Sequence, residues 1–327
     1  MDSIADYFRE INLEFLINIR AEDPEFEFEV HTQAEPGNSE KFVLFGTYTQ
    51  EVHEKIVDRV ESGNQKYFIH ETDLIKRYEF LLTEKLMEDL SMGSPSIEIL
   101  KRAYQISRQI MQEYFDNLGS TRILRILKSA VQIIETCLNR GNLEFIDVYD
   151  LTDKENNHYS HCVNNALYCM IFGRSLQMDS KDLRELGLGG MLFDIGKKEI
   201  PEEIFSKEGK LTDEEFKAIR KHPMAGQSIL FDMRCYTDRI YEMASQHHEK
   251  FNGAGYPAKL QGESISYFAR ICAITDVFDA LLCNRHHRES LTPYDALVEM
   301  KEKMPGHFDQ KILGTFLNAF ATAEQAA

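Results

Sequence analysis

No uninterrupted run of about 18 apolar residues occurs in this chain, so the sequence predicts no transmembrane helix. Residues 1–6 are acidic and lack the basic start and the apolar stretch of a secretory signal, which indicates a cytoplasmic protein. The six cysteines include no CxxC pair and stand mostly in apolar, helical contexts. We therefore interpret them as reduced residues of the core.

Positive charge is also scarce relative to negative charge. The chain has 37 Lys and Arg residues against 54 Asp and Glu residues, which gives a formal net charge of −17. Because duplex binding depends on neutralising phosphates with Lys and Arg, we expect no long nucleic-acid partner. A small phosphorylated ligand is compatible with this charge, since cations and metal ions inside a cleft can hold it locally.

The length of 327 residues favours two modest hydrophobic cores over one. Near the N-terminus, residues 26–30, 41–45 and 66–70 have the pattern of half-buried strands, and residues 51–61 have that of an amphipathic helix. These segments predict a small α/β domain of regulatory or sensory type over residues 1–90.

The pattern is helical from residue 73 onward. One long periodic segment covers residues 97–138, with a kink or hinge expected at Gly119 and Ser120. We interpret residues 91–142 as a helical linker, which could connect the domains or pack in the seam of a homodimer. Two ordinary helices of a bundle are the alternative.

The second half of the chain, residues 143–327, predicts an all-α bundle. Thr212 and Glu215 form a capping-box pattern that marks one helix start. Helices are predicted at residues 153–176, 180–192, 212–221, 222–231, 238–248, 266–283, 293–303 and 309–320. The predicted fold class is therefore α+β, a small N-terminal α/β domain followed by a helical bundle.

Histidines gather in this helical half, and several stand at predicted helix ends. A single histidine is more often structural than a ligand, but His222 begins one predicted helix while His247 and His248 end another. Adjacent residues on a helix diverge by about 100°, so two neighbouring ligands are best used at a helix end. Asp276 lies in an apolar helix, where a carboxylate is costly unless it is paired or binds a metal.

Several motifs in this half occur in a fixed order and spacing. They are Asp194-Ile195-Gly196-Lys197, residues 207–211, Lys221-His222-Pro223, His247-His248-Glu249, Gly255-Tyr256-Pro257 and residues 276–281. Together they resemble the HD-GYP domains, a branch of the HD phosphohydrolase superfamily whose members hydrolyse cyclic di-GMP and related cyclic dinucleotides. The resemblance covers residues 153–320 and implies a helical HD-type bundle.

The resemblance implies two sets of metal ligands that share Asp194. The first set is His161, Asp194 and Asp276, and the second is Asp194, His222, His247 and His248. Such a pair of ions generates a metal-bound hydroxide for in-line attack on a phosphodiester and polarises the phosphoryl oxygens. A mixed set of imidazoles and carboxylates suits Fe or Mn, with Zn and Ni also compatible.

The resemblance also implies residues that act on the substrate. Asp194 and Lys197 would be catalytic, since Lys197 offsets charge that develops on the phosphate. Tyr256 would donate a hydrogen bond to a phosphate from its glycine-containing loop, for which an ordinary turn between helices is the alternative. Arg285 and Arg288 match basic positions that contact the ligand.

Phe193 is the main departure from the family pattern, because it stands where the family has the His of its His-Asp dyad. A Phe side chain cannot coordinate a metal, so the first site keeps three ligands, a number that is sufficient in other catalytic metal sites. The second site keeps its whole set. We expect at least one bound ion and leave the choice between one and two open.

Smaller departures lie around the ligand cleft. Asn156 and Asn157 stand where members that bind a third metal carry a Glu, so no third ion is expected. His286 and His287 replace the Pro and Tyr of the family's Arg-Pro-Tyr segment, and Asn252 replaces an Asp before the GYP loop. Altered nucleotide preference and lost activity are both compatible with these changes.

Two functions follow from this pattern. The first is a metal-dependent phosphodiesterase of a cyclic dinucleotide in bacterial second-messenger signalling. The alternative is a degenerate receptor or scaffold that binds a nucleotide, or a signalling protein through the GYP loop or the N-terminal domain, without hydrolysis. Phe193 is the residue that separates the two. A third interpretation, unrelated structural histidines, requires a separate buried partner for each of Asp194, His222 and Asp276.

Overall fold

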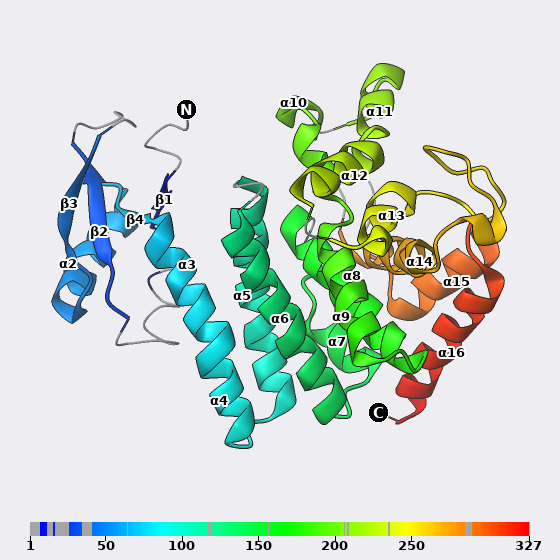
Figure 1. The fold of residues 1–327 in the computed structure, drawn as a ribbon, viewed down its shortest axis with the longest axis horizontal. Helices are drawn as coiled ribbons and strands as arrows, with labels where there is room; N and C mark the ends of the chain where they lie inside the picture. The colour runs from blue at the N-terminus through cyan, green and yellow to red at the C-terminus, as the bar shows by residue number, and fades with distance from the viewer. Residues whose placement is uncertain are drawn as a thin grey trace. The chain divides into compact units, whose positions relative to one another are not determined.

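The computed structural model describes the chain as two compact units, Met1–Lys85 and Leu86–Ala327. The described residues are 7–11, 16, 26–34, 41–63, 65–116, 120–155, 157–205, 207, 209–234, 236–284 and 290–326. A small antiparallel sheet lies in the first unit, and the second is helical (Figure 1). The predicted α+β class is confirmed.

The first unit is built on a four-stranded sheet of order β1-β4-β2-β3, in which every neighbouring pair is antiparallel. Its elements are β1 (Phe8–Glu10), β2 (Glu29–Gln33), β3 (Phe42–Thr47), α2 (Gln50–Glu61), β4 (Phe68–His70) and α3 (Glu71–Phe80). Val30 of β2, Ile56 of α2 and Ile69 of β4 are buried and form part of its core. Strand β1 was not predicted from the sequence.

In the chain, α3 is followed by a π-helical turn, η2 (Leu81–Lys85), and α4 (Leu86–Ser91) is the first helix of the second unit. The remaining α-helices are α5 (Ser96–Asp116), α6 (Thr121–Arg140), α7 (Phe145–Leu151), α8 (His158–Ser175), α9 (Ser180–Leu192), α10 (Glu202–Phe205), α11 (Asp213–Ile219), α12 (His222–Met233), α13 (Asp238–Gln246), α14 (Tyr267–Leu282), α15 (Pro293–Lys303) and α16 (Gln310–Ala326). Two 3-10 helices, η3 (Ile195–Glu199) and η4 (Gly262–Ser264), join them. Within the described ranges, no helix is long and apolar enough to cross a membrane.

Helix α8 is the central element of this unit. Residues 162–173 of α8 are buried without interruption, and the helix packs against α9, α14, α5 and α7 (Figure 1). A helix that is covered all round must carry apolar or internally bonded side chains on every face. Accordingly, Ser160, His161 and Asn164 near its start bond to other side chains of the protein.

The predicted linker, residues 91–142, belongs to the helical unit instead of standing apart from it. The chain forms two helices, and Ser120 caps α6 by accepting a hydrogen bond from the backbone of Ile123; Gly119 lies outside the described residues. The apolar faces of α5 and α6 pack on each other, on α8 and on α9. Burial of these faces stabilises the pair of helices.

Local signals placed most helix boundaries correctly. Helices α9 and α15 have the predicted bounds, and the capping box of Thr212 and Glu215 forms at the start of α11. The cysteines that the structure describes are buried and reduced, as expected; Cys235 lies outside the described residues. They are Cys137, Cys162, Cys169, Cys272 and Cys283.

Candidate metal centre

The predicted ligands lie at the ends of four helices and in the middle of a fifth. His161 is in the first turn of α8, Asp194 follows the end of α9, and His222 is the first residue of α12. His247 and His248 follow α13, and Asp276 lies within α14. The packing of these helices brings together side chains that are more than a hundred positions apart in the chain.

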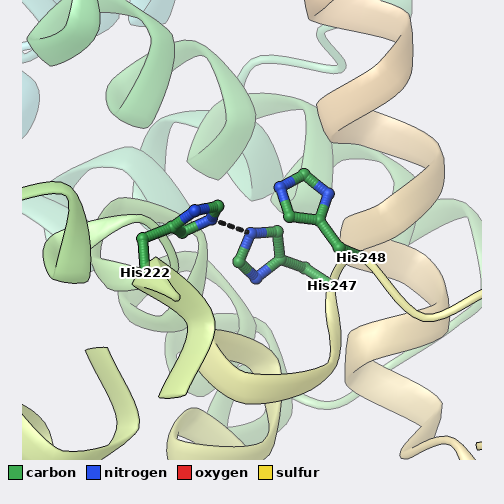
Figure 2. Close-up of side chains that lie close together, drawn as sticks. All are labelled: His222, His247 and His248. Atoms are coloured by element: carbon green, nitrogen blue, oxygen red, sulfur yellow. Dashed lines mark hydrogen bonds between the residues drawn. The ribbon is translucent and has the colours of Figure 1, made fainter. Parts of the chain in front are cut away.

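His222, His247 and His248 form a compact imidazole cluster (Figure 2). Each ring offers one nitrogen, and these ligand atoms lie within 4.8 Å of one another. Nε2 of His222 and Nε2 of His247 are 3.1 Å apart. Burial strongly lowers the pKa of His248, helped by the neighbouring His247, so this ring is neutral and has a lone pair to give to a metal.

Backbone carbonyls fix the tautomers of two of these rings. Nδ1 of His222 donates to the carbonyl oxygen of Ile219 at 2.7 Å, and Nδ1 of His247 donates to that of Ala244 at 2.9 Å. Because Nδ1 carries the proton, each neutral ring presents a bare lone pair at Nε2. The two Nε2 atoms, 3.1 Å apart, are thus placed either to share a proton or to bind one cation together.

Asp194 adds a carboxylate to the same point. Its Oδ1 lies 3.2 Å from Nε2 of His222 and 3.6 Å from Nε2 of His247, and it accepts no hydrogen bond from any described residue. Burial alone would raise the pKa of Asp194, but Lys197 and the two imidazoles outweigh burial and hold this pKa far below its usual range. A buried, ionised oxygen and two imidazole lone pairs that converge in this way fit a divalent metal ion.

The first ligand set centres on His161. Its Nε2 lies 3.0 Å from Oδ1 of Asp276 and 3.9 Å from Oδ2 of Asp194, while its Nδ1 lies 2.6 Å from Oδ2 of Asp279. Burial alone would lower the pKa of His161, but the hydrogen bonds to Asp276 and Asp279 raise it to about 9. A divalent ion at Nε2 would take the place of the second proton that these carboxylates stabilise.

The Phe193 ring lies between the two ligand sets. Its centroid is 5.6 Å from that of His161 and 4.9 Å from that of His247, and it meets both rings edge to face. Phe193 is 1% exposed, so its ring is enclosed by other protein atoms. The position therefore faces both candidate ion sites, and its hydrocarbon side chain contributes packing but no ligand.

Lys197 and Tyr256 lie beside this cluster. Nζ of Lys197 is 2.5 Å from Oδ2 of Asp194. The ring of Tyr256 is 4.8 Å from that of His248, and the guanidinium of Arg220 lies 4.3 Å from the Tyr256 centroid. Burial raises the pKa of Tyr256, so its hydroxyl remains a hydrogen-bond donor.

The loop that carries Tyr256 is held in place by Glu249. This carboxylate accepts hydrogen bonds from the backbone of Ala258 at 2.7 Å and of Leu260 at 3.1 Å. A Cβ atom at Gly255 would collide with the backbone of Glu249, so the close approach requires glycine. The loop is thus a rigid element, which explains how Tyr256 is kept next to His248.

Two site residues were not identified from the sequence. Oδ2 of Asp279 accepts a hydrogen bond from Nδ1 of His161 at 2.6 Å, and Nδ2 of Asn164 donates to Oδ1 of Asp279 at 3.0 Å. The available signal was a second carboxylate one helical turn after Asp276 in an otherwise apolar helix. Five residues named in the sequence analysis lie outside the described residues, so the expectations for them stay predictions: Asn156, Arg285, His286, His287 and Arg288.

Comparisons with known proteins identify the family of the helical unit. Residues 149–312 match the sequence model of the HD domain family. A cyclic di-GMP phosphodiesterase of Pseudomonas aeruginosa is 37% identical over 49% of this chain and 39% of its own length. The 3'3'-cGAMP-specific phosphodiesterase 1 of Vibrio cholerae is 28% identical over 82% of this chain and 57% of its own length. The chain therefore spans less than two thirds of these relatives.

A solved structure shares the fold along almost the whole chain. It is an HDG"Y"P protein from Bdellovibrio bacteriovorus, with a TM-score of 0.64 and 16% sequence identity, and the match covers 97% of this chain and 99% of that one. At this identity the likeness concerns the arrangement of the elements alone.

Proposed function

Because this chain belongs to the HD domain family, we propose that it is a metal-dependent phosphodiesterase of cyclic di-GMP or a related cyclic dinucleotide. The names of its relatives supply the substrate class. The observation that carries the proposal is that Oδ1 of Asp194 is buried and lies 3.2 Å from Nε2 of His222 and 3.6 Å from Nε2 of His247. Oδ1 of Asp194 has no hydrogen-bond partner among the described residues, and a divalent ion would give it one.

The residues present would hold up to two ions, each with its own set of ligands and with Asp194 common to both sets. His161, Asp194 and Asp276 would hold one, and Asp194, His222, His247 and His248 would hold the other. A divalent ion bound there lowers the pKa of a coordinated water and polarises phosphoryl oxygens. Imidazole and carboxylate ligands favour Fe or Mn in this role.

The side chains around the ions would bind and orient the phosphodiester. Burial alone would lower the pKa of Lys197, but Asp194 raises it above the ordinary value, so Lys197 keeps a positive charge beside the reacting phosphate. Tyr256, whose ring lies beside that of His248, would donate its O–H to a phosphate oxygen. Arg285 and Arg288 would contact the ligand, as the family pattern implies.

A receptor function is the second candidate, and the Phe193 ring favours it. This ring contacts both His161 and His247, and it leaves the first site without the ligand that the family pattern has at this position. With three ligands left, the first site would hold its ion less firmly than the second. A protein that binds one ion and the nucleotide without turnover would then signal by occupancy.

Anaerobic turnover of cyclic di-GMP and of 3'3'-cGAMP, with Fe(II) or Mn(II) supplied to the full chain, tests both candidates. Asp194→Ala serves as the control, because it removes the carboxylate common to both ion sites while leaving the helix ends in place. Turnover in the wild type that disappears in Asp194→Ala supports the phosphodiesterase. Binding of metal and nucleotide without product sinks it and supports the receptor.

A further inference from the structure

We propose that Tyr104 of α5 is a positioning residue for the metal ligand His161 and acts on it through Asn164 and Asp279. The inference rests on the proposed role of His161 in metal binding. It assigns a function in the site to a helix that lies outside residues 149–312, the range matched by the family.

A directed chain of hydrogen bonds joins Tyr104 to His161. The Tyr104 hydroxyl donates to Oδ1 of Asn164 at 2.8 Å, and Nδ2 of Asn164 donates to Oδ1 of Asp279 at 3.0 Å. The other oxygen of Asp279 accepts from Nδ1 of His161 at 2.6 Å. Each donor meets an acceptor, and the chain converges on Asp279, whose two oxygens accept from Asn164 on one side and from His161 on the other.

The Asn164 amide is held in a single orientation. Nδ2 of Asn164 also donates to the carbonyl oxygen of Asp153 at 2.8 Å, and the backbone N–H of Asp153 donates to the Tyr104 hydroxyl at 2.9 Å. If the amide turned over, its oxygen would face the carboxylate of Asp279, and the two would repel. The Tyr104 O–H supplies the donor that keeps the amide oxygen on the opposite side.

Tyr104, Asn164 and Asp279 are shielded from solvent. Tyr104 is 3% exposed, and Asn164 and Asp279 are fully buried. Burial raises the pKa of Tyr104, so its hydroxyl keeps the proton that it donates. Loss of the hydroxyl leaves the fully buried Asn164 Oδ1 without this donor, and a buried acceptor that is left unpaired moves to find a new partner.

The consequence for the site follows from how metal-binding histidines are held. The partner of the second ring nitrogen sets the tautomer and orientation of the ring, and removing such support typically lowers metal affinity or activity about 10–100-fold. Asp279 is the direct partner of His161, and Tyr104 fixes the group that fixes Asp279. The position of α5 therefore affects the geometry of the first ion site.

Tyr104→Phe in the full chain tests the proposal, with Tyr114→Phe as the matched control. Tyr114 is a buried tyrosine of the same helix whose hydroxyl contacts that of Tyr236, away from Asp279. Calorimetric titration of the metal-free protein with Mn(II) should show affinity about 10-fold or more weaker in Tyr104→Phe. We expect kcat to fall with KM little changed, and Tyr114→Phe to match the wild type in both.

A second readout does not depend on metal. In metal-free protein labelled with 15N-histidine, the Nδ1–H resonance of His161 should shift in Tyr104→Phe and stay in place in Tyr114→Phe. His161→Gln identifies the resonance by its loss. Because the role runs through Asp279, Tyr104→Phe should have a smaller effect in an Asp279→Asn background than in the wild type.

Unchanged Mn(II) affinity together with an unchanged His161 resonance in Tyr104→Phe overturns the proposal. A wild-type protein that binds no Mn(II) instead contradicts the proposed function, and the histidine resonance then still decides whether Tyr104 positions His161. Equal losses in Tyr104→Phe and Tyr114→Phe would also count against the proposal, since they point to general destabilisation of α5.

Discussion

Phe193→His exchanges a buried hydrocarbon ring for an imidazole at the point where the two ligand sets meet. The Phe193 centroid lies 5.6 Å from that of His161 and 4.9 Å from that of His247, so a histidine ring in the same place reaches toward both ion sites. We expect the variant to bind an additional ion and to turn over cyclic di-GMP faster than the wild type.

The magnitude can be worked out from burial and from binding. Placing a polar imidazole where a fully buried phenyl ring packed should cost about 1–3 kcal/mol in the metal-free protein. For a helical unit of this size, that corresponds to a fall in Tm of about 2–12 °C. One further ion at 100 times its Kd returns about 2.7 kcal/mol, so saturating Mn(II) should recover most of the loss.

Scanning calorimetry with and without Mn(II), the metal content per chain and anaerobic turnover check this together. Phe193→Leu is the control, because it also disturbs the packing but offers no ligand, and its Tm should show no extra recovery with Mn(II). If Phe193→His binds no additional ion and shows no gain in turnover at saturating metal, the idea that Phe193 withholds a ligand is refuted.

Two further predictions concern the loop and a half-buried lysine. Glu249→Gln keeps one acceptor oxygen, whereas the backbone N–H groups of Ala258 and Leu260 need one each, so we expect a several-fold higher KM with metal content unchanged. The exposed Glu263→Gln is the control and should match the wild type. An unchanged KM in Glu249→Gln would contradict the role of the loop. Burial lowers the pKa of Lys154 from 10.5 to about 8. The unfolded chain therefore binds more protons than the folded one between these values, and this residue makes stability rise with pH across that window, so urea unfolding should show a smaller rise in Lys154→Met than in the wild type.

Local chemistry explains which parts of the fold were predictable. Helix α9 begins where Asp179 accepts a hydrogen bond from the backbone of Asp182, and α15 begins with Thr292 as cap and Pro293 as first residue. These signals act over a single turn and can be read without knowing the fold. Residues 91–142 show the opposite case, because an amphipathic pattern reveals an apolar face without saying which neighbour covers it.

The sequence by itself determined the helix ends and, through them, that His222, His247 and Asp194 would stand at the starts and stops of helices, where side chains can converge. Only the tertiary structure decided their partners. It placed Asp279 2.6 Å from His161, 118 positions away in the chain, and it set the Phe193 ring between the ligand sets. Helix ends depend on hydrogen bonds within a few residues, whereas these contacts depend on how whole helices pack.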